Sequence, residues 1–174
     1  MSEIEIHHEH GHDADAFGKK IGVLVGIIGI LLAGVTIASH REHTAAVIHK
    51  TEANDQWSYY QAKKIRGEVL GVGASLSTLV SPSSDARTAA AKMQADRDRE
   101  NQEADDLKKE AEAKETESVR SEQRALRFDL GEGLLELGLV LTSLYFLSKK
   151  KYFPAFGLSA AGLGLIAAIL GALL

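Results

Sequence analysis

Residues 21–38 read IGVLVGIIGILLAGVTIA, an apolar run without a charged side chain. A helix needs about 20 predominantly apolar residues to cross the hydrocarbon core of a bilayer. Two further apolar segments, at roughly 130–148 and at 152–174, approach this length, and the second of them also lacks charge. These three segments predict an all-α membrane protein with three transmembrane helices.

The charge distribution around these segments predicts how the chain is organised. An acidic leader precedes the first apolar run, whereas a cleaved signal peptide begins with a short basic region, so we interpret this run as a retained anchor. The expected parts are a disordered His- and acid-rich tail at 1–18, a first transmembrane helix at 19–39, an extramembrane helical hairpin at 40–127, a second transmembrane helix at 128–148, a basic loop at 149–151 and a third transmembrane helix at 152–174.

The segment 40–127 is rich in Ala, Glu, Lys, Gln and Arg, which are strong helix formers. Its single proline is Pro82, followed by Ser83, Ser84 and Asp85. Proline stops a helix, and Ser and Asp cap the start of the next one, so we expect a turn at 81–85. Because the two arms have similar lengths, they are predicted to form an antiparallel, coiled-coil-like hairpin.

Apolar residues in the first arm recur at alternating steps of four and three, which places them on one coiled-coil seam. These residues are Ile65, Val69, Val72, Leu76 and Leu79. The matching residues of the second arm are Ala90, Met93, Ala104, Leu107, Ala111 and Leu126, interrupted by Arg97, Glu100 and Lys114. Such a seam buries too little apolar surface to hold two helices alone, so we expect neighbouring subunits to contribute.

Three carboxylates share one face of the second predicted span: Asp129, Glu132 and Glu136. Intramembrane carboxylates usually face a bundle interior, a pore or a partner. Two interpretations follow for Glu136, a proton or cation site and a hydrogen-bonding clamp between helices. A hairpin symmetric about residue 83 would place Glu132 opposite Gly34, and Glu136 opposite Gly29 and Ile30.

Small residues recur in the spans at intervals that suit close helix contacts in lipid. They are Gly22 with Gly26, and Ala160, Gly164, Ala168 and Ala172.

An aromatic motif follows the first span. It consists of Asp55, Gln56, Trp57, Tyr59, Tyr60 and Lys63. Our first interpretation is an aromatic contact within the hairpin or between subunits, and the alternative is a ligand-binding platform.

A family resemblance rests on three stretches, which are Asp-Gln-Trp-Ser-Tyr-Tyr-Gln-Ala-Lys at 55–63, Phe-Asp-Leu-Gly-Glu at 128–132 and Leu-Glu-Leu-Gly-Leu-Val-Leu at 135–141. In these stretches the chain resembles a bacterial membrane family known as domain of unknown function 4337. The resemblance covers about residues 20–174. It implies a bacterial inner-membrane protein and supplies no activity.

Basic residues predict the orientation, because those in short loops tend to stay cytoplasmic. Lys149, Lys150 and Lys151 form the whole connection between the second and third spans, and Lys19 and Lys20 precede the first. We therefore expect a cytoplasmic N-terminus and an extracytoplasmic hairpin and C-terminus.

Several kinds of chemistry lack support in the sequence. The chain has no cysteine, and its net charge of −4 comes without the basic, aromatic-interleaved patch that nucleic-acid binding needs. The candidate metal ligands in the tail are His7, His8, His10 and His12, but their spacing fixes no coordination geometry, so we predict a solvated tail and no metal site. No nucleophile–base pair or phosphate-binding glycine loop stands out, and neither an enzyme nor a cofactor is expected.

Two functions remain. The first is a homo-oligomeric membrane scaffold whose partners are the lipid bilayer, further copies of itself and, as an option, an envelope protein. The alternative is a small ion or proton channel, or a transporter component, that uses Glu132 and Glu136.

Overall fold

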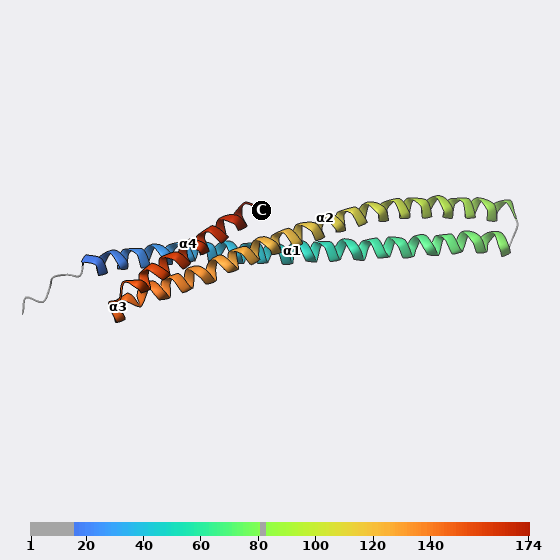
Figure 1. The fold of residues 1–174 in the computed structure, drawn as a ribbon. Helices are drawn as coiled ribbons and strands as arrows, with labels where there is room; N and C mark the ends of the chain where they lie inside the picture. The colour runs from blue at the N-terminus through green and yellow to red at the C-terminus, as the bar shows by residue number, and fades with distance from the viewer. Residues whose placement is uncertain (1–15, 81–82) are drawn as a thin grey trace, which may run out of the picture. The chain divides into compact units, whose positions relative to one another are not determined.

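The computed structural model describes residues 16–80 and 83–174, and its regular elements are all helices (Figure 1). They are α1 (Ala16–Val80), α2 (Ser84–Ser143), α3 (Tyr145–Ser148) and α4 (Tyr152–Ala172). No strand occurs within these described ranges. Residues 16–18, which the sequence assigned to the tail, belong to α1. Residues 1–15 of that tail and residues 81 and 82 of the predicted turn lie outside the described residues.

The start of α2 follows the capping chemistry of its sequence. The backbone N–H of Ala86 donates to Ser83 Oγ at 3.2 Å, and the N–H of Arg87 donates to the Ser83 carbonyl at 3.1 Å. Asp85 lies in the first turn, where its negative charge interacts favourably with the helix dipole. Ser83 thus satisfies backbone donors that a helix start otherwise leaves without partners.

Three helical segments are long and apolar enough to cross a membrane. They lie in α1, in α2 with its continuation α3, and in α4. This finding confirms the all-α class and the three candidate spans that the sequence predicted.

The chain divides into two compact units. Among the described residues, unit 1 contains 16–41 and 123–174, and unit 2 contains 42–122. Unit 1 has an apolar core to which α1, α2 and α4 all contribute. The buried residues of this core are Ile28, Val35, Phe128, Leu135, Ala161 and Ala168.

Within unit 1, glycines let the backbones of α2 and α4 approach closely. A Cβ atom added to Gly138 would lie 2.7 Å from the Gly157 carbonyl oxygen, and one on Gly131 would lie 2.8 Å from the Gly164 carbonyl oxygen. No side chain larger than hydrogen fits at either position without moving a backbone.

The small-residue pattern of α4 was predicted in part. Gly164 and Ala168 are buried against α2 as expected, whereas Ala160 is half-buried and Ala172 is exposed. The buried small residues of α4 are Gly157, Ala161, Gly164, Ala168 and Gly171. Alternating steps of four and three keep these residues on the face toward α2, whereas the predicted strict step of four drifts around the helix.

In unit 2, the part of α1 after residue 41 packs against the first part of α2. Lys50 pairs with Glu115, Lys63 with Glu103, and Gly73 faces Met93, so residue numbers rise along one helix as they fall along the other. The buried apolar residues of this contact are all alanines, namely Ala53, Ala74, Ala90, Ala104 and Ala111. The unit is therefore joined by a close, alanine-lined contact.

The apolar stripe predicted for the first arm does not form this contact. Its exposed fractions are 65% for Ile65 and Val69, 59% for Val72, 54% for Leu76 and 79% for Leu79. The seam prediction is therefore wrong for α1. For α2 it is largely right, since Ala90, Ala104 and Ala111 are buried and Met93 and Leu107 half-buried, but Leu126 is exposed. Alanine and glycine permit a closer approach, which brings oppositely charged side chains of the two helices together.

Candidate functional site

Two of the three carboxylates in the second candidate span join α1 to α2 in unit 1. The hydroxyl of Thr36 donates a hydrogen bond to Glu132 Oε1 at 2.8 Å, and the buried Ser39 hydroxyl donates to Asp129 Oδ1. In a low-dielectric surrounding, such hydrogen bonds satisfy polar groups that would otherwise be costly to bury. Asp129 and Glu132 thus form hydrogen bonds between α1 and α2, whereas the clamp between helices was predicted for Glu136.

The register of this contact differs from the predicted one. Glu132 bonds to Thr36 instead of facing Gly34, and Gly29 faces Leu139, not Glu136. A prediction based on symmetry about residue 83 takes no account of side-chain hydroxyls. The hydrogen bonds of Thr36 and Ser39 provide a physical reason for the shifted pairing.

Glu136 is separated from the other two carboxylates. Its side chain is exposed on the outer surface of unit 1, and it makes no hydrogen bond or ion pair to another residue within 16–80 and 83–174. Its exposed neighbours on α2 include Leu137 and Val140. A carboxylate on an otherwise apolar helix face needs a partner from outside the chain, water or a bound cation if that face lies in lipid.

In unit 2, the motif residue Lys63 makes the most extensive polar contact between α1 and α2. Its Nζ lies 3.0 Å from Glu100 Oε2 and also pairs with Glu103. Arg66 Nη1 lies 3.4 Å from Glu100 Oε1. Glu100 is 5% exposed, and it therefore sits inside the helix contact, not at its edge.

These contacts change the pKa values of both partners. The hydrogen bonds that Lys63 donates to Glu103 and to Glu100, in that order of effect, raise the pKa of Lys63 above its ordinary value. The hydrogen bond from Lys63 lowers the pKa of Glu100, with smaller contributions from the charges of Lys63 and Arg66. Both shifts favour the charged forms, so the pair holds α1 and α2 together as ions near neutral pH.

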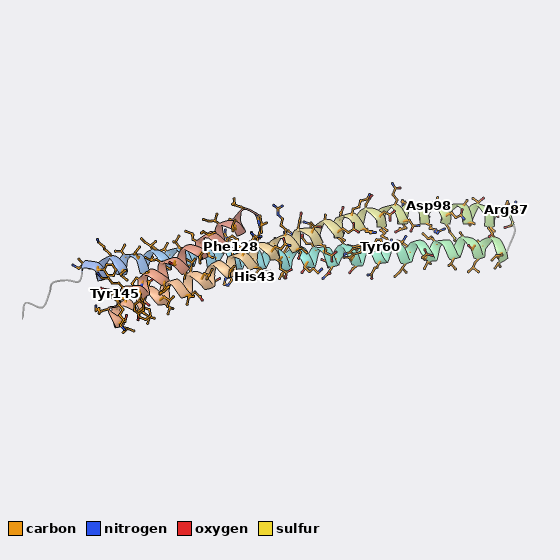
Figure 2. All side chains as sticks on the ribbon, in the orientation of Figure 1. His43, Tyr60, Arg87, Asp98, Phe128 and Tyr145 are labelled. Carbon is orange, nitrogen blue, oxygen red and sulfur yellow. The ribbon has the colours of Figure 1, made fainter. Side chains whose placement is uncertain are left out.

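The remaining motif residues precede Lys63 on α1. The rings of Trp57 and Tyr60 pack edge to face, with centroids 5.5 Å apart and an interplanar angle of 87° (Figure 2 labels Tyr60). Tyr59 is 62% exposed and lines an open depression of about 400 Å³ together with Lys63, Glu103, Asp106, Leu107 and Glu110. Asp55 is exposed, and Gln56 has a buried Oε1 without a hydrogen-bond donor among the described residues. The rings therefore contact each other within α1.

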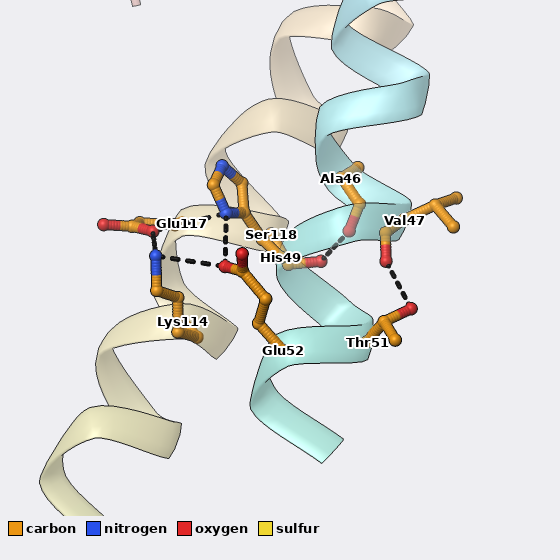
Figure 3. Close-up of polar contacts among 8 residues, drawn as sticks. All are labelled: Ala46, Val47, His49, Thr51, Glu52, Lys114, Glu117 and Ser118. Atoms are coloured by element: carbon orange, nitrogen blue, oxygen red, sulfur yellow. Dashed lines mark hydrogen bonds and ion pairs between the residues drawn. The ribbon is translucent and has the colours of Figure 1, made fainter. Parts of the chain in front are cut away.

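A second polar cluster joins the helices nearer the other end of unit 2 (Figure 3). Lys114 Nζ lies 3.1 Å from Glu52 and 2.9 Å from Glu117, while His49 Nδ1 lies 3.4 Å from Glu117. The Ser118 hydroxyl donates to the Ala46 carbonyl at 2.9 Å. The hydrogen bonds of Glu117 and then Glu52 raise the pKa of Lys114.

In the sequence, Lys114 and Glu100 interrupt the predicted apolar seam, and for this reason neither polar cluster was predicted. The signal that could have found them is charge pairing across the proposed hairpin, because each of these residues has an oppositely charged residue at the matching position of the other arm. No group of three or more His, Asp or Glu suited to a metal occurs within the described residues. The candidate ligands His7, His8, His10 and His12 lie outside them.

Comparison with known proteins gives a family but no activity. A family model with the description "Domain of unknown function (DUF4337)" matches residues 17–174. No curated protein and no solved structure matches the chain. The match extends over nearly the whole sequence and confirms the resemblance seen in its motifs, so this chain belongs to the DUF4337 family.

Proposed function

We propose that this chain is a homo-oligomeric scaffold of the bacterial inner membrane. In this proposal the three apolar segments cross the bilayer, and the helices of unit 2 form an extracytoplasmic hairpin that associates laterally with the hairpins of other copies. The observation that carries the proposal is the exposed apolar stripe on α1, formed by Ile65, Val69, Val72, Leu76 and Leu79.

The stripe is suited to binding another helix. Its residues recur at alternating steps of four and three, the period at which side chains of two supercoiled helices interlock. Small exposed apolar residues are common singly, but a continuous row of branched side chains on a soluble surface marks an interaction site. The second helix of the same chain packs on a different face of α1, through Ala53 and Ala74, so it is not the partner.

A second copy of the chain is the occupant that fits this stripe best. Membrane spans would hold all copies in the same orientation, so identical stripes would meet in parallel and in register. A single stripe of this length is small beside the roughly 800 Å² per partner of a standard interface. It therefore supplements contacts between the spans, where the exposed Glu136 offers a second self-contact.

A substitution pair tests this proposal. Changing Val69 and Leu76 to Glu places charges in the stripe and should reduce the subunit number of the detergent-solubilised protein in native mass measurements. The matched control changes Val47 and Val119 to Glu, since both are exposed apolar residues of unit 2 outside the stripe. A monomeric wild-type protein, or equal effects of both pairs, would refute the stripe as a self-contact.

Crosslinking distinguishes self-association from binding of an envelope protein. The chain contains no cysteine, so Val72→Cys introduces a single thiol in the stripe. In parallel, in-register copies the two thiols meet within disulfide distance, and oxidation should give a covalent dimer. A crosslink to a different protein in place of the dimer would assign the stripe to an envelope partner.

Ion or proton transport is a second candidate, and the outward-facing Glu136 is the observation that favours it. A transport role requires this carboxylate to line water in the assembly. Glu136→Gln keeps the shape of the side chain but removes its titratable proton, so it should abolish a pH-dependent ion flux in liposomes. If wild-type liposomes show no flux above empty ones across a broad pH range, this function is ruled out.

A further inference from the structure

Two polar side chains are exposed on the otherwise apolar outer surface of unit 1. The structure describes all residues of 130–147 and 153–174, and within these ranges only Glu136 on α2 and Ser159 on α4 have polar side chains that are exposed. Their exposed neighbours are apolar, among them Leu137, Leu158 and Leu163. If this surface lies in lipid, an unpaired carboxyl group there is costly, so Glu136 needs a partner from outside its own chain.

The contact between α2 and α4 determines how these two residues lie along unit 1. Gly131 of α2 lies against Gly164 of α4, and a second glycine contact, seven residues on along α2 and seven back along α4, shows that the helices are antiparallel. Counting five residues on from Gly131 and five back from Gly164 leads to Glu136 and Ser159. The two residues therefore lie at nearly the same level along unit 1.

The two side chains do not meet within one chain, although they are level. Ser159 is two residues beyond Gly157, which faces α2, and two residues turn a helix by about 200°, so Ser159 points away from α2. Its hydroxyl donates to the Ala155 carbonyl of its own helix at 2.9 Å. Glu136 makes no hydrogen bond or ion pair to another residue in the described part of the chain. One chain thus presents a carboxyl group on one outer helix face and a hydroxyl group on another.

A second copy of the chain offers the missing partner at the right depth. Copies inserted in the same orientation are related by rotation about an axis normal to the bilayer, so Glu136 of each copy is level with Ser159 of every other. A hydroxyl group has one donor and two acceptor sites, so Ser159 can bond Glu136 in either charge state. Gly162 lies one turn from Ser159, and a Cβ atom added to it would have nothing within 4 Å, which leaves room for another helix to approach.

We propose that Glu136 of one copy forms a hydrogen bond with Ser159 of the next copy. The outer face of α2 in one chain then packs on the outer face of α4 in its neighbour, and each chain uses one face of each kind. Such a head-to-tail contact closes into a ring when the rotation between neighbours divides a full turn. The contact rests on the homo-oligomeric function proposed above and specifies where the spans of neighbouring copies meet.

Cysteine crosslinking of the full chain in native membranes tests which residues are neighbours. The chain contains no cysteine, so a variant with both Glu136→Cys and Ser159→Cys carries two thiols. The thiol at position 136 of one copy then lies beside that at position 159 of the next, and oxidation should give a ladder of covalent dimers, trimers and larger species. Either single variant should give no ladder. The matched control combines Ser159→Cys with Leu130→Cys, because Leu130 is also exposed on α2 but lies about 9 Å from the level of Glu136.

A double-mutant cycle measures the hydrogen bond itself, with association followed by native mass spectrometry. Glu136→Leu and Ser159→Ala should each weaken association by about threefold, the average for an interhelical hydrogen bond in a membrane, and the double variant should be no weaker than either single one. Glu136→Gln should retain association, because its amide still bonds the hydroxyl.

The outcomes separate this contact from the scaffold as a whole. Additive effects in the cycle, or a ladder in the control as strong as in the test pair, would overturn the contact between Glu136 and Ser159. An oligomeric wild-type protein whose test pair gives no ladder would overturn this contact alone. A monomeric wild-type protein would overturn both the contact and the proposed scaffold.

Discussion

At the scale of single residues, Glu100 illustrates how polar side chains join α1 to α2 in unit 2. It is nearly buried, and its two oxygens lie near Lys63 and Arg66. A buried carboxylate is unfavourable unless cations or hydrogen-bond donors surround it. The helix contact therefore depends on the charge state of this group, which makes the contact sensitive to pH.

We predict that the pairing of α1 with α2 in unit 2 weakens in acid and in strong base. The hydrogen bond with Lys63 lowers the pKa of Glu100, so the separated helices bind its proton more readily; the stabilisation is complete above the ordinary pKa of a glutamate and is lost as pH falls through the lowered pKa. The carboxylates of Glu103 and Glu100 raise the pKa of Lys63, so its stabilisation is complete below the ordinary pKa of a lysine and is lost as pH rises through the raised pKa. Spin labels at the exposed positions Ser58 and Lys108 would report the distance between helices.

Glu100→Gln provides the specific check on this prediction. The amide cannot form the ion pair, so the helices should separate more often at pH 7 and show a smaller change between pH 5 and pH 2. Glu110→Gln is the matched control, because Glu110 is exposed and makes no ion pair among the described residues. Equal acid responses of the two variants would show that Glu100 is not responsible.

At the scale of helical elements, the contact between α2 and α4 depends on the absence of side chains. Gly138 meets Gly157 and Gly131 meets Gly164 with backbone groups in direct contact. In lipid, where apolar burial drives helix association little, such close packing supplies dispersion contacts that larger side chains would prevent. Two glycines of α2, Gly138 and Gly133, should therefore differ sharply in the effect of substitution by alanine.

We predict opposite effects of alanine at Gly138 and at Gly133. At Gly138 the new methyl group would collide with the Gly157 carbonyl, and the overpacking should destabilise the folded protein by about 1–3 kcal/mol. At Gly133 nothing lies within 4 Å of the new Cβ, so alanine should stabilise α2 by up to about 1 kcal/mol. Unfolding midpoints of the two variants in one detergent would test this, and shifts of the same sign would contradict it.

The elements could be predicted from sequence, but the faces that they use could be predicted only in part. Apolar length identified the spans, and Pro82 with Ser83 located the break between α1 and α2. The four–three spacing of Ile65 and Val69 was real, yet periodicity says only that residues share a face, not which helix covers it. Ala104 and Glu100 are both buried in the contact between α1 and α2, and the apolar period alone did not show that a charged residue would lie among the alanines there.

The candidate site was likewise predicted only in part, because the sequence indicated the helix of each carboxylate but not its partners. Asp129, Glu132 and Glu136 do lie on α2, but their different surroundings follow from long-range partners. Thr36 and Ser39 are ordinary polar residues at the end of an apolar run, and nothing in their local sequence identifies them as donors to α2. Register between distant helices arises from the sum of such contacts, which a single sequence does not reveal.

At the scale of the whole molecule, the basic residues bear on how the chain is oriented in a membrane. Lys149 to Lys151 connect two apolar segments by a very short loop, which is the situation in which positive charge determines topology most strongly. The long charged segment between the first and second predicted spans, residues 40–127, is largely exempt from that rule. The lysine loop should therefore be cytoplasmic, and Ser83 should lie on the opposite side.

We predict that single cysteines at Ser83 and Lys150 react from opposite faces of the membrane. Both positions are exposed, and the natural chain has no cysteine to interfere. A membrane-impermeant maleimide applied to intact cells should label Ser83→Cys at once, but Lys150→Cys only after the membrane is permeabilised. Labelling of both positions in intact cells would disprove the topology with three crossings.

The two faces of α1 in unit 2 respond differently to dissolved ions. The face that meets α2 carries Lys63 and its carboxylate partners, and mobile ions screen such attractions, so added sodium chloride loosens the pairing within the chain. In the proposed assembly the opposite face, with Ile65 and Val69, would pack mainly through apolar contacts, which sulfate strengthens by its exclusion from protein surfaces. Ionic strength would then set the balance between the pairing of α1 with α2 in one chain and the proposed contact between chains, and the identity of the salt would shift that balance further.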